Sequence, residues 1–136
     1  MRRQQGSAAV ELVLLTPVLV VLLLFVVAVG RLAETRGDVD AAARDAARAA
    51  SIARGPDSAR TDGEAAARQR LAEGRVTCRT LDVQLSTAEF RSGGTVAATV
   101  GCVVDLSDLT LLGVPGTRRV SATFAEPVDI FRAVGP

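Results

Sequence analysis

The most constraining feature of this sequence is an uncharged apolar run from Leu12 to Val29, which directly follows a carboxylate at Glu11. At about 1.5 Å per helical residue, the run is long enough to cross a thin or untilted hydrocarbon core as one helix. A carboxylate at the bilayer centre costs roughly 2.5 to 3.5 kcal/mol, so an acidic residue at the entrance of the run calls for a functional reason. We therefore predict a membrane-spanning helix with a functional acidic residue at its start.

A secretory signal peptide is the main alternative to a retained membrane span. The segment Ala28-Val-Gly30 resembles a small-x-small cleavage site, and cleavage there would leave a chain that begins at Arg31. The apolar run is longer than the usual signal-peptide core of about 7 to 15 residues, and Glu11 is unusual at the entry to such a core. We therefore expect the chain to stay in the membrane.

The charges on either side of the run give opposing indications of its orientation. The arginines before it, Arg2 and Arg3, are outnumbered by those after it, and this count alone disfavours a cytoplasmic N-terminus. A leader of residues 1–6 is nevertheless too short to fold outside, and acidic residues interleave the later arginines. We predict a single-pass cell membrane protein with a short cytoplasmic N-terminus and an extracytoplasmic C-terminal part.

The helical period continues beyond the apolar run. Apolar side chains of residues 32–50 recur on one side, and residues 18–54 contain no proline. We therefore expect one helix from about Ala8 to Ile52, half in lipid and half outside, with a mild kink at Pro17. Its outer half is rich in alanine, which permits close packing either on the chain's own sheet or on neighbouring helices.

The pattern changes twice after residue 53. Turn-forming residues come first, and Thr61-Asp-Gly-Glu64 then predicts a capping box that opens a short second helix, which Gly74 ends. The hydrophobic period next becomes two, which predicts strands. The predicted strand segments are residues 76–85, 96–106 and 120–124.

These elements predict an α+β fold. A long N-terminal membrane-spanning helix continues into an external stalk and is followed by a short second helix and a small three-stranded antiparallel sheet. The predicted divisions are a cytoplasmic leader (1–6), a transmembrane helix (7–30), an external continuation of that helix (31–53) and a small external α+β domain (54–136).

The two cysteines, Cys78 and Cys102, lie in the part that we place outside the membrane, where disulfides form. A wide loop centred on residues 89–91 would bring them opposite each other, whereas a tight turn at Ser92-Gly93 would separate them. The apolar face also changes parity between Cys78 and Leu81, which predicts a bulge near residues 79–80. We expect the wide loop and a Cys78–Cys102 disulfide.

The composition disfavours several classes of function. The formal net charge is +1 and the chain has no His, Trp or Tyr, so imidazole bases and aromatic stacking platforms for nucleic acid are missing. The sequence shows no Ser-His-Asp set, metal-ligand cluster, phosphate-binding glycine loop or Cys-x-x-Cys pair. We therefore expect no catalytic residues, no metal, no cofactor and no nucleic-acid partner.

Two apolar clusters near the end of the chain are expected to cover the sheet or the stalk. If they prove exposed, they are candidate contacts for a second protein subunit. The first cluster contains Leu109, Leu111, Leu112 and Val114, and the second contains Val128, Ile130 and Phe131.

Four segments carry a resemblance to a known family. Gly6-Ser-Ala-Ala-Val-Glu11, followed by the apolar helix, resembles a prepilin peptidase site, and Ala43-Arg-Asp-Ala-Ala-Arg48 is similar to an Ala-Arg-Glu-Gly-Ala-Arg segment of the family. Residues 105–116 and 126–129 also resemble the C-terminal half of actinobacterial members. The chain resembles the TadE-like family of minor pilins or pseudopilins from tight-adherence (Tad) type IV pilus systems.

The resemblance implies that a prepilin peptidase cuts between Gly6 and Ser7 at the cytoplasmic face. The new amine at Ser7, with a reference pKa of about 7.7 to 8.0, would then pair with Glu11 of a neighbouring subunit. The implied partners are the prepilin peptidase, other pilins or minor pilins, the inner pilus assembly platform and the lipid bilayer. Ser7 and Leu12 stand where family members often carry Phe, which leaves N-methylation open.

Two other classes of function make different predictions. A signal-anchored extracytoplasmic binding module would keep its N-terminus uncut and would tolerate the loss of the Glu11 carboxylate. A membrane-tethered enzyme would need a catalytic constellation, and isolated acids such as Asp82, Asp105 and Asp108 are more simply solvated carboxylates. We expect an assembly subunit, in or at the base of a pilus.

Overall fold

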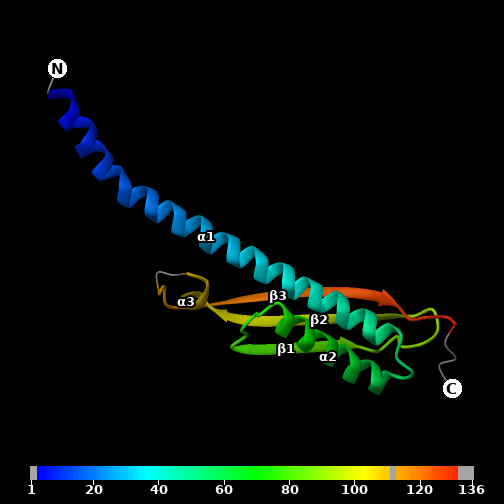
Figure 1. Cartoon of the computed structure of the whole chain (residues 1–136). Coiled ribbons are helices and arrows are strands. Elements are labelled where there is room, and N and C mark those ends of the chain that lie inside the picture. Colours follow the sequence, from blue (N-terminus) through cyan, green and yellow to red (C-terminus); the bar gives the residue numbers. More distant parts are fainter. Residues whose placement is uncertain (1–2, 111–112, 132–136) are drawn as a thin grey trace.

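The computed structural model describes residues 3–110 and 113–131 and confirms the expected α+β architecture (Figure 1). A long helix is followed by a second helix and an antiparallel sheet, with one short helical turn between the last two strands. The sheet has the strand order β1-β2-β3. The elements are α1 (Arg3–Ser51), α2 (Pro56–Glu73), β1 (Thr80–Ser86), β2 (Thr95–Asp105), α3 (Leu106–Leu109) and β3 (Thr117–Pro127).

Helix α1 is 49 residues long and begins at Arg3, five residues earlier than expected from the sequence. At 1.5 Å per residue it extends for about 70 Å. Pro17 lies inside it without interrupting it, and the helix follows a gentle curve (Figure 1). Directly before the proline, the Thr16 hydroxyl donates a hydrogen bond of 2.7 Å to the carbonyl of Leu12, one turn earlier in the helix.

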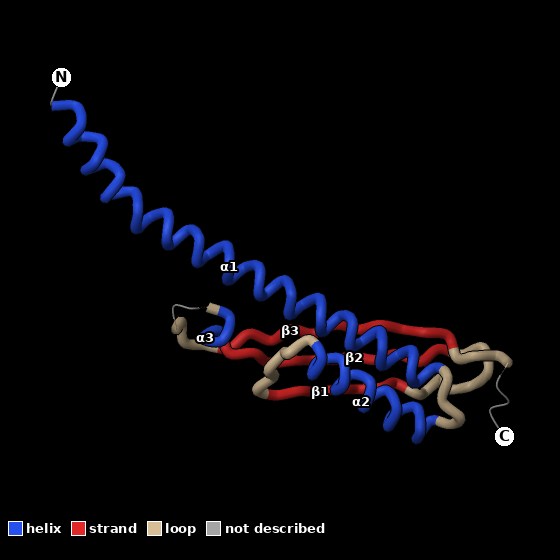
Figure 2. Tube along the Cα trace, viewed as in Figure 1, coloured by secondary structure: helices blue, strands red, loops and turns tan. Residues whose placement is uncertain are grey.

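The second half of α1 packs with α2 on one face of the sheet (Figure 2). Helix α1 contacts β2 and β3, and α2 contacts β1. We call this unit, residues 31–110 and 113–131, the helix–sheet domain. The alanine-rich face of α1 therefore lies against its own chain, which settles the choice that the sequence left open. Its fully buried members are Val39, Ala42, Ala43, Ala46, Ala47 and Ala50.

The two helices approach closely because small residues meet where they cross. Gly63 of α2 is buried, and a Cβ atom at this position would lie 3.0 Å from the Ala46 carbonyl oxygen and 2.6 Å from a methyl group of Leu85. A side chain here would push α2 away from α1 and β1. Alanine and glycine thus set the spacing of the layers.

The start of α2 differs from the prediction. The helix begins at Pro56 rather than near Thr61, because Gly55 and the following proline already satisfy the requirements of a helix start. The Ser58 hydroxyl accepts a hydrogen bond of 3.1 Å from the Gly55 amide. Thr61 lies inside the helix, and its hydroxyl donates to the Asp57 carbonyl at 3.1 Å.

Helix α2 ends at the predicted place, but the residue in the left-handed backbone conformation is not the predicted glycine. Gly74 caps the helix with φ of −72°, and Arg75 takes the positive φ of 55°. A Cβ atom added at Gly74 would lie 2.7 Å from the Asp38 carboxyl carbon, so a side chain here would displace the Asp38 carboxylate. The Val76 amide donates to the Leu71 carbonyl at 3.1 Å and closes the helix end.

Strand β1 begins later than the sequence pattern indicated. Residues 76–78 form part of the connection from α2, and the regular ladder starts with Thr80 opposite Val103. The predicted bulge is therefore wrong, because the change of parity marks the boundary between connection and strand. The connection from β1 to β2 is the expected wide loop, residues 87–94 (Figure 2).

The predicted apolar clusters are only partly covered. Leu109 and Val128 are buried, as expected, whereas Val114 is exposed and Leu111 and Leu112 lie outside the described residues. Ile130 is 62% exposed and Phe131 is 90% exposed, so the expected cover does not extend to these two side chains.

Candidate functional site

The predicted cleavage and assembly residues lie in the first turns of α1. Gly6, Ser7 and Glu11 are all exposed, and Met1 and Arg2 lie outside the described residues. A Cβ atom added at Gly6 would have no atom within 4 Å outside its own helix backbone. Packing within the chain therefore gives no reason for glycine at this position.

Glu11 stands at the start of the apolar half of α1 without a partner. Within residues 3–110 and 113–131, no ion pair or hydrogen bond involves its carboxylate. The helix–sheet domain begins about 30 Å further along the same helix, at 1.5 Å per residue. A cation that pairs with Glu11 must therefore come from outside the described part of this chain.

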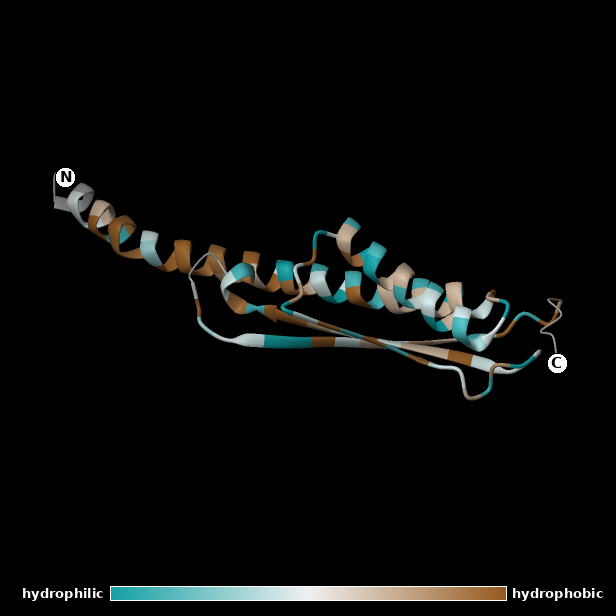
Figure 3. Cartoon of the chain, turned by 90° about the horizontal axis from the view of Figure 1, so that it is seen from below, coloured by the Kyte–Doolittle hydropathy of each residue, from teal (hydrophilic) through white to brown (hydrophobic). Residues whose placement is uncertain are grey.

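The apolar half of α1 projects from the helix–sheet domain and is exposed along its length (Figure 3). Leu12 is 66% exposed and Phe25 is 62% exposed. Among the described residues, α1 is the one helix long and apolar enough to cross a membrane. An apolar surface of this size is typical of a helix that lies in lipid or packs on other apolar helices.

Cys78 and Cys102 form the predicted disulfide, with their Cα atoms 5.3 Å apart. Cys102 is fully buried on the helix-covered face of β2, and Cys78 lies in the connection that leads from α2 to β1. Leu81, rather than Cys78, is the register partner of Cys102. The bond therefore fastens the α2–β1 connection to the central strand.

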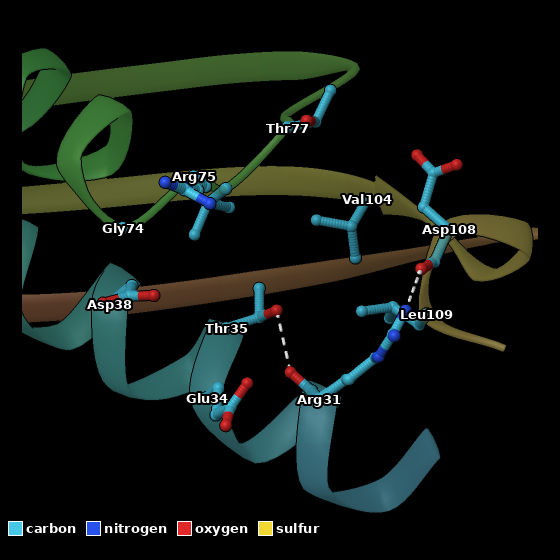
Figure 4. Close-up of a pocket in the computed structure, with 11 residues that line it drawn as sticks. Arg31, Glu34, Thr35, Asp38, Gly74, Arg75, Thr77, Val104, Asp108 and Leu109 are labelled. Carbon is cyan, nitrogen blue, oxygen red and sulfur yellow. Dashed lines mark hydrogen bonds between the residues drawn. The ribbon is translucent and has the colours of Figure 1, made fainter. Parts of the chain in front are cut away.

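Sequence reasoning missed a charged cavity at the end of the helix–sheet domain nearest the apolar half of α1. Its volume is about 310 Å³, and it lies between α1, the α2–β1 connection and α3 (Figure 4). Arg31, Glu34 and Asp38 line it from α1, and Arg75 lines it from the opposite wall. The alternation of charge directly after the apolar run marks the α1 side of the cavity in the sequence, but no pattern in the sequence places Arg75 opposite it.

At the edge of this cavity nearest the apolar half of α1, one hydrogen bond joins α1 to α3 and a second lies within α1. The Arg31 guanidinium donates to the Asp108 carbonyl at 3.4 Å, and the Thr35 hydroxyl donates to the Arg31 carbonyl at 3.0 Å. The Asp108 carboxylate points away from Arg31 (Figure 4). Across the described ranges, no group of three or more Cys, Asp or Glu side chains is placed to hold a metal ion.

The comparisons with known proteins identify the N-terminal part of the chain. Searches of curated proteins and of solved structures found no match. The model of the TadE-like protein family matches residues 6–48, which contain the Gly6–Glu11 segment, the apolar run and most of the outer half of α1. Residues 6–48 are therefore a TadE-like segment, and the resemblance is confirmed for this part of the chain, whereas residues 105–116 and 126–129 lie outside the match.

Proposed function

We propose that this chain is a TadE-like minor pilin or pseudopilin. After cleavage by a prepilin peptidase between Gly6 and Ser7, it takes part in the assembly of a tight-adherence type IV pilus or a related secretion complex. The observation that carries the proposal is that one helix, α1, contains the motif Gly6–Glu11 followed by an exposed apolar half, and that both lie within the family match. The role is structural rather than enzymatic.

The surroundings of Gly6 support a role in cleavage. Glycine inside a helix costs about 1 kcal/mol relative to alanine, and no contact among the described residues requires it there. The same cost makes the first turns of α1 easier to unwind, and a residue without a side chain lets a protease approach the backbone closely. Gly6 is thus suited to the residue before the cut.

Glu11 suits a role in assembly once Ser7 has become the N-terminus. The Ser7 amine is largely cationic at neutral pH, and it lies one helical turn before Glu11 in sequence. In a bundle of apolar helices, the amine of one subunit pairs with the carboxylate of the next and offsets the cost of its burial. This pairing would set the axial position of neighbouring subunits.

The proposed topology places residues 1–6 in the cytoplasm, residues 7–30 in the cell membrane and the helix–sheet domain on the extracytoplasmic side. The Cys78–Cys102 disulfide fits this assignment, because disulfides persist in oxidising compartments. The proposed partners are the prepilin peptidase, other pilins or minor pilins, the inner assembly platform and the bilayer.

The processing test compares two glycines of the same helix. In cells that make the prepilin peptidase, intact mass spectrometry of the membrane-extracted protein should find a chain that begins at Ser7. Gly6→Ala should block the cut and leave the leader in place. Gly37→Ala is the matched control, since Gly37 also lies in α1 with open space around it, and this variant should be cut normally.

Three other results would each contradict the proposal. An intact leader in the unaltered chain would indicate a signal-anchored binding module. A chain that begins at Arg31 would indicate a secreted domain released by signal peptidase. Equal cutting of the Gly6→Ala and Gly37→Ala variants would place the recognised site elsewhere.

Glu11→Ala should leave cleavage intact and impair assembly. We expect the fraction of the chain that crosslinks to other pilins to fall at least about tenfold, since a buried charge left without its partner costs about 3 to 5 kcal/mol. Glu73→Ala removes an exposed carboxylate from α2 and should leave crosslinking unchanged. Normal crosslinking of the Glu11→Ala variant would show that the Glu11 carboxylate has no role in assembly.

A further inference from the structure

The cavity beside Arg31 gathers charges that remain unpaired. No ion pair among the described residues joins Arg31, Glu34, Asp38 or Arg75 to an opposite charge, and the one hydrogen bond from these side chains goes from Arg31 to a main-chain carbonyl. Charged side chains elsewhere on α1 and α2 do form ion pairs, among them Arg44 with Asp40 and Arg68 with Glu64. The four cavity groups sum to a formal charge of zero, with two of each sign.

The order of the charges follows the direction of α1. Arg31 is the first charged residue after the apolar run, Glu34 lies about 4.5 Å further along the helix axis and Asp38 about 10 Å further. If the apolar run spans a membrane, the positive group faces the lipid surface and the negative groups lie beyond it. A ligand at the surface therefore meets first a cation and then carboxylates.

We propose that this cavity binds the phosphoethanolamine headgroup of a membrane lipid. The phosphate lies next to Arg31, and the ammonium reaches outward to Glu34 and Asp38, where it donates charge-assisted hydrogen bonds. Arg75 lines the cavity from the α2–β1 connection, so the lining holds two guanidinium groups and two carboxylates. A volume of about 310 Å³ equals that of roughly ten water molecules, which is enough for a small headgroup. The proposal rests on the membrane span of the proposed function.

The lining of the cavity selects ethanolamine among common headgroups. No aromatic side chain lines it, and a trimethylammonium group, which cannot donate N–H bonds, is usually held by aromatic rings. An anionic headgroup such as phosphatidylglycerol has no cation to satisfy Glu34 and Asp38. Ethanolamine offers both the anion and a hydrogen-bonding cation in the required order.

Native mass spectrometry of the delipidated full chain in detergent tests the proposal. The chain is titrated separately with phosphatidylethanolamine, phosphatidylcholine and phosphatidylglycerol that carry identical acyl chains. We expect phosphatidylethanolamine to bind about tenfold more tightly than the other two lipids. Of the three headgroups, ethanolamine alone carries an ammonium group that can donate hydrogen bonds to the Glu34 and Asp38 carboxylates. Equal binding of the three lipids, or preference for phosphatidylglycerol, would overturn the proposal.

Two variants, one that removes a positive charge and one that removes a negative charge, distinguish a specific site from general electrostatic attraction. Arg31→Gln and Glu34→Gln should each abolish the preference, although they change the net charge in opposite directions. Arg36→Gln is the control, because Arg36 is an exposed arginine of α1 outside the cavity lining, and it should keep the preference. An equal loss in the Arg36→Gln variant would assign the effect to net charge and overturn the site.

Free phosphoethanolamine identifies the source of the headgroup. If the soluble compound displaces the lipid at matched concentrations, the membrane source is wrong. The N-terminal mass of the same sample reports cleavage at Gly6 independently. A failed lipid preference in a chain that begins at Ser7 would therefore remove this site and leave the proposed function standing.

Discussion

Reduction of the Cys78–Cys102 disulfide should lower the free energy of unfolding of the helix–sheet domain by about 3.5 kcal/mol. The bond joins residues 24 apart in sequence, and the chain-entropy model gives this value for a loop of that length. The loss is a large fraction of the net stability of a small domain, which is about 5 to 15 kcal/mol. The sheet has three strands and one helix-covered face, so little else compensates.

Pulse proteolysis of the full chain in detergent measures this loss. Trypsin cuts after arginine, and arginines are spread over the helix–sheet domain, so cleavage reports the unfolded fraction at each urea concentration. With an m value of about 1.5 kcal/mol per molar, reductant should lower the urea midpoint by about 2 M. Cys78→Ala has no bond to break and should not respond to reductant. An unchanged midpoint in the reduced parent chain would show that the bond contributes little.

Ala46→Leu should lower the free energy of unfolding of the helix–sheet domain by about 3 kcal/mol. Ala46 is fully buried on α1, and its carbonyl oxygen would lie 3.0 Å from a Cβ atom added at Gly63 of α2. A leucine side chain needs space that this interface does not contain, so the helices must separate or the side chain must leave its preferred rotamer. The cost comes from packing, since leucine and alanine both favour helix.

Ala33→Leu provides the matched control for this substitution. Ala33 lies in the same helix but is exposed. The change should therefore alter the free energy of unfolding, measured by urea titration, by less than about 0.5 kcal/mol. The two variants differ only in the surroundings of the substituted residue. Equal effects would mean that the alanine face of α1 is not a close-packed interface.

The sequence predicted the fold where local pattern and packing agree. The apolar run and the proline-free alanine segment predicted α1, and clean alternation from Val96 to Val104 predicted β2. The predicted start of α2 was wrong. Thr61 fits a capping box, but Gly55 and Pro56 provide an equally good helix start about one and a half turns earlier, and the helix begins there. Local signals at a helix end compete, and tertiary contacts choose between them.

The cavity could not be predicted because it depends on how segments far apart in sequence are placed together. Arg31 lines the cavity from α1 and Arg75 lines it from the α2–β1 connection, and these two segments come together only in the folded chain. Gly6, Ser7 and Glu11 could be proposed for cleavage and pairing from the sequence alone, because their spacing lies within one helix. A linear motif is readable in sequence, whereas a cavity requires the fold.

The uninterrupted course of α1 has a mechanical consequence. The same helical rod that enters the apolar half also forms the spine of the helix–sheet domain, and it continues through Pro17. A tilt of the apolar half would therefore tilt the helix–sheet domain with it, because both belong to one continuous helix. In the proposed assembly, neighbouring subunits that contact the first turns of α1 would set the direction in which the sheet faces without contacting the sheet.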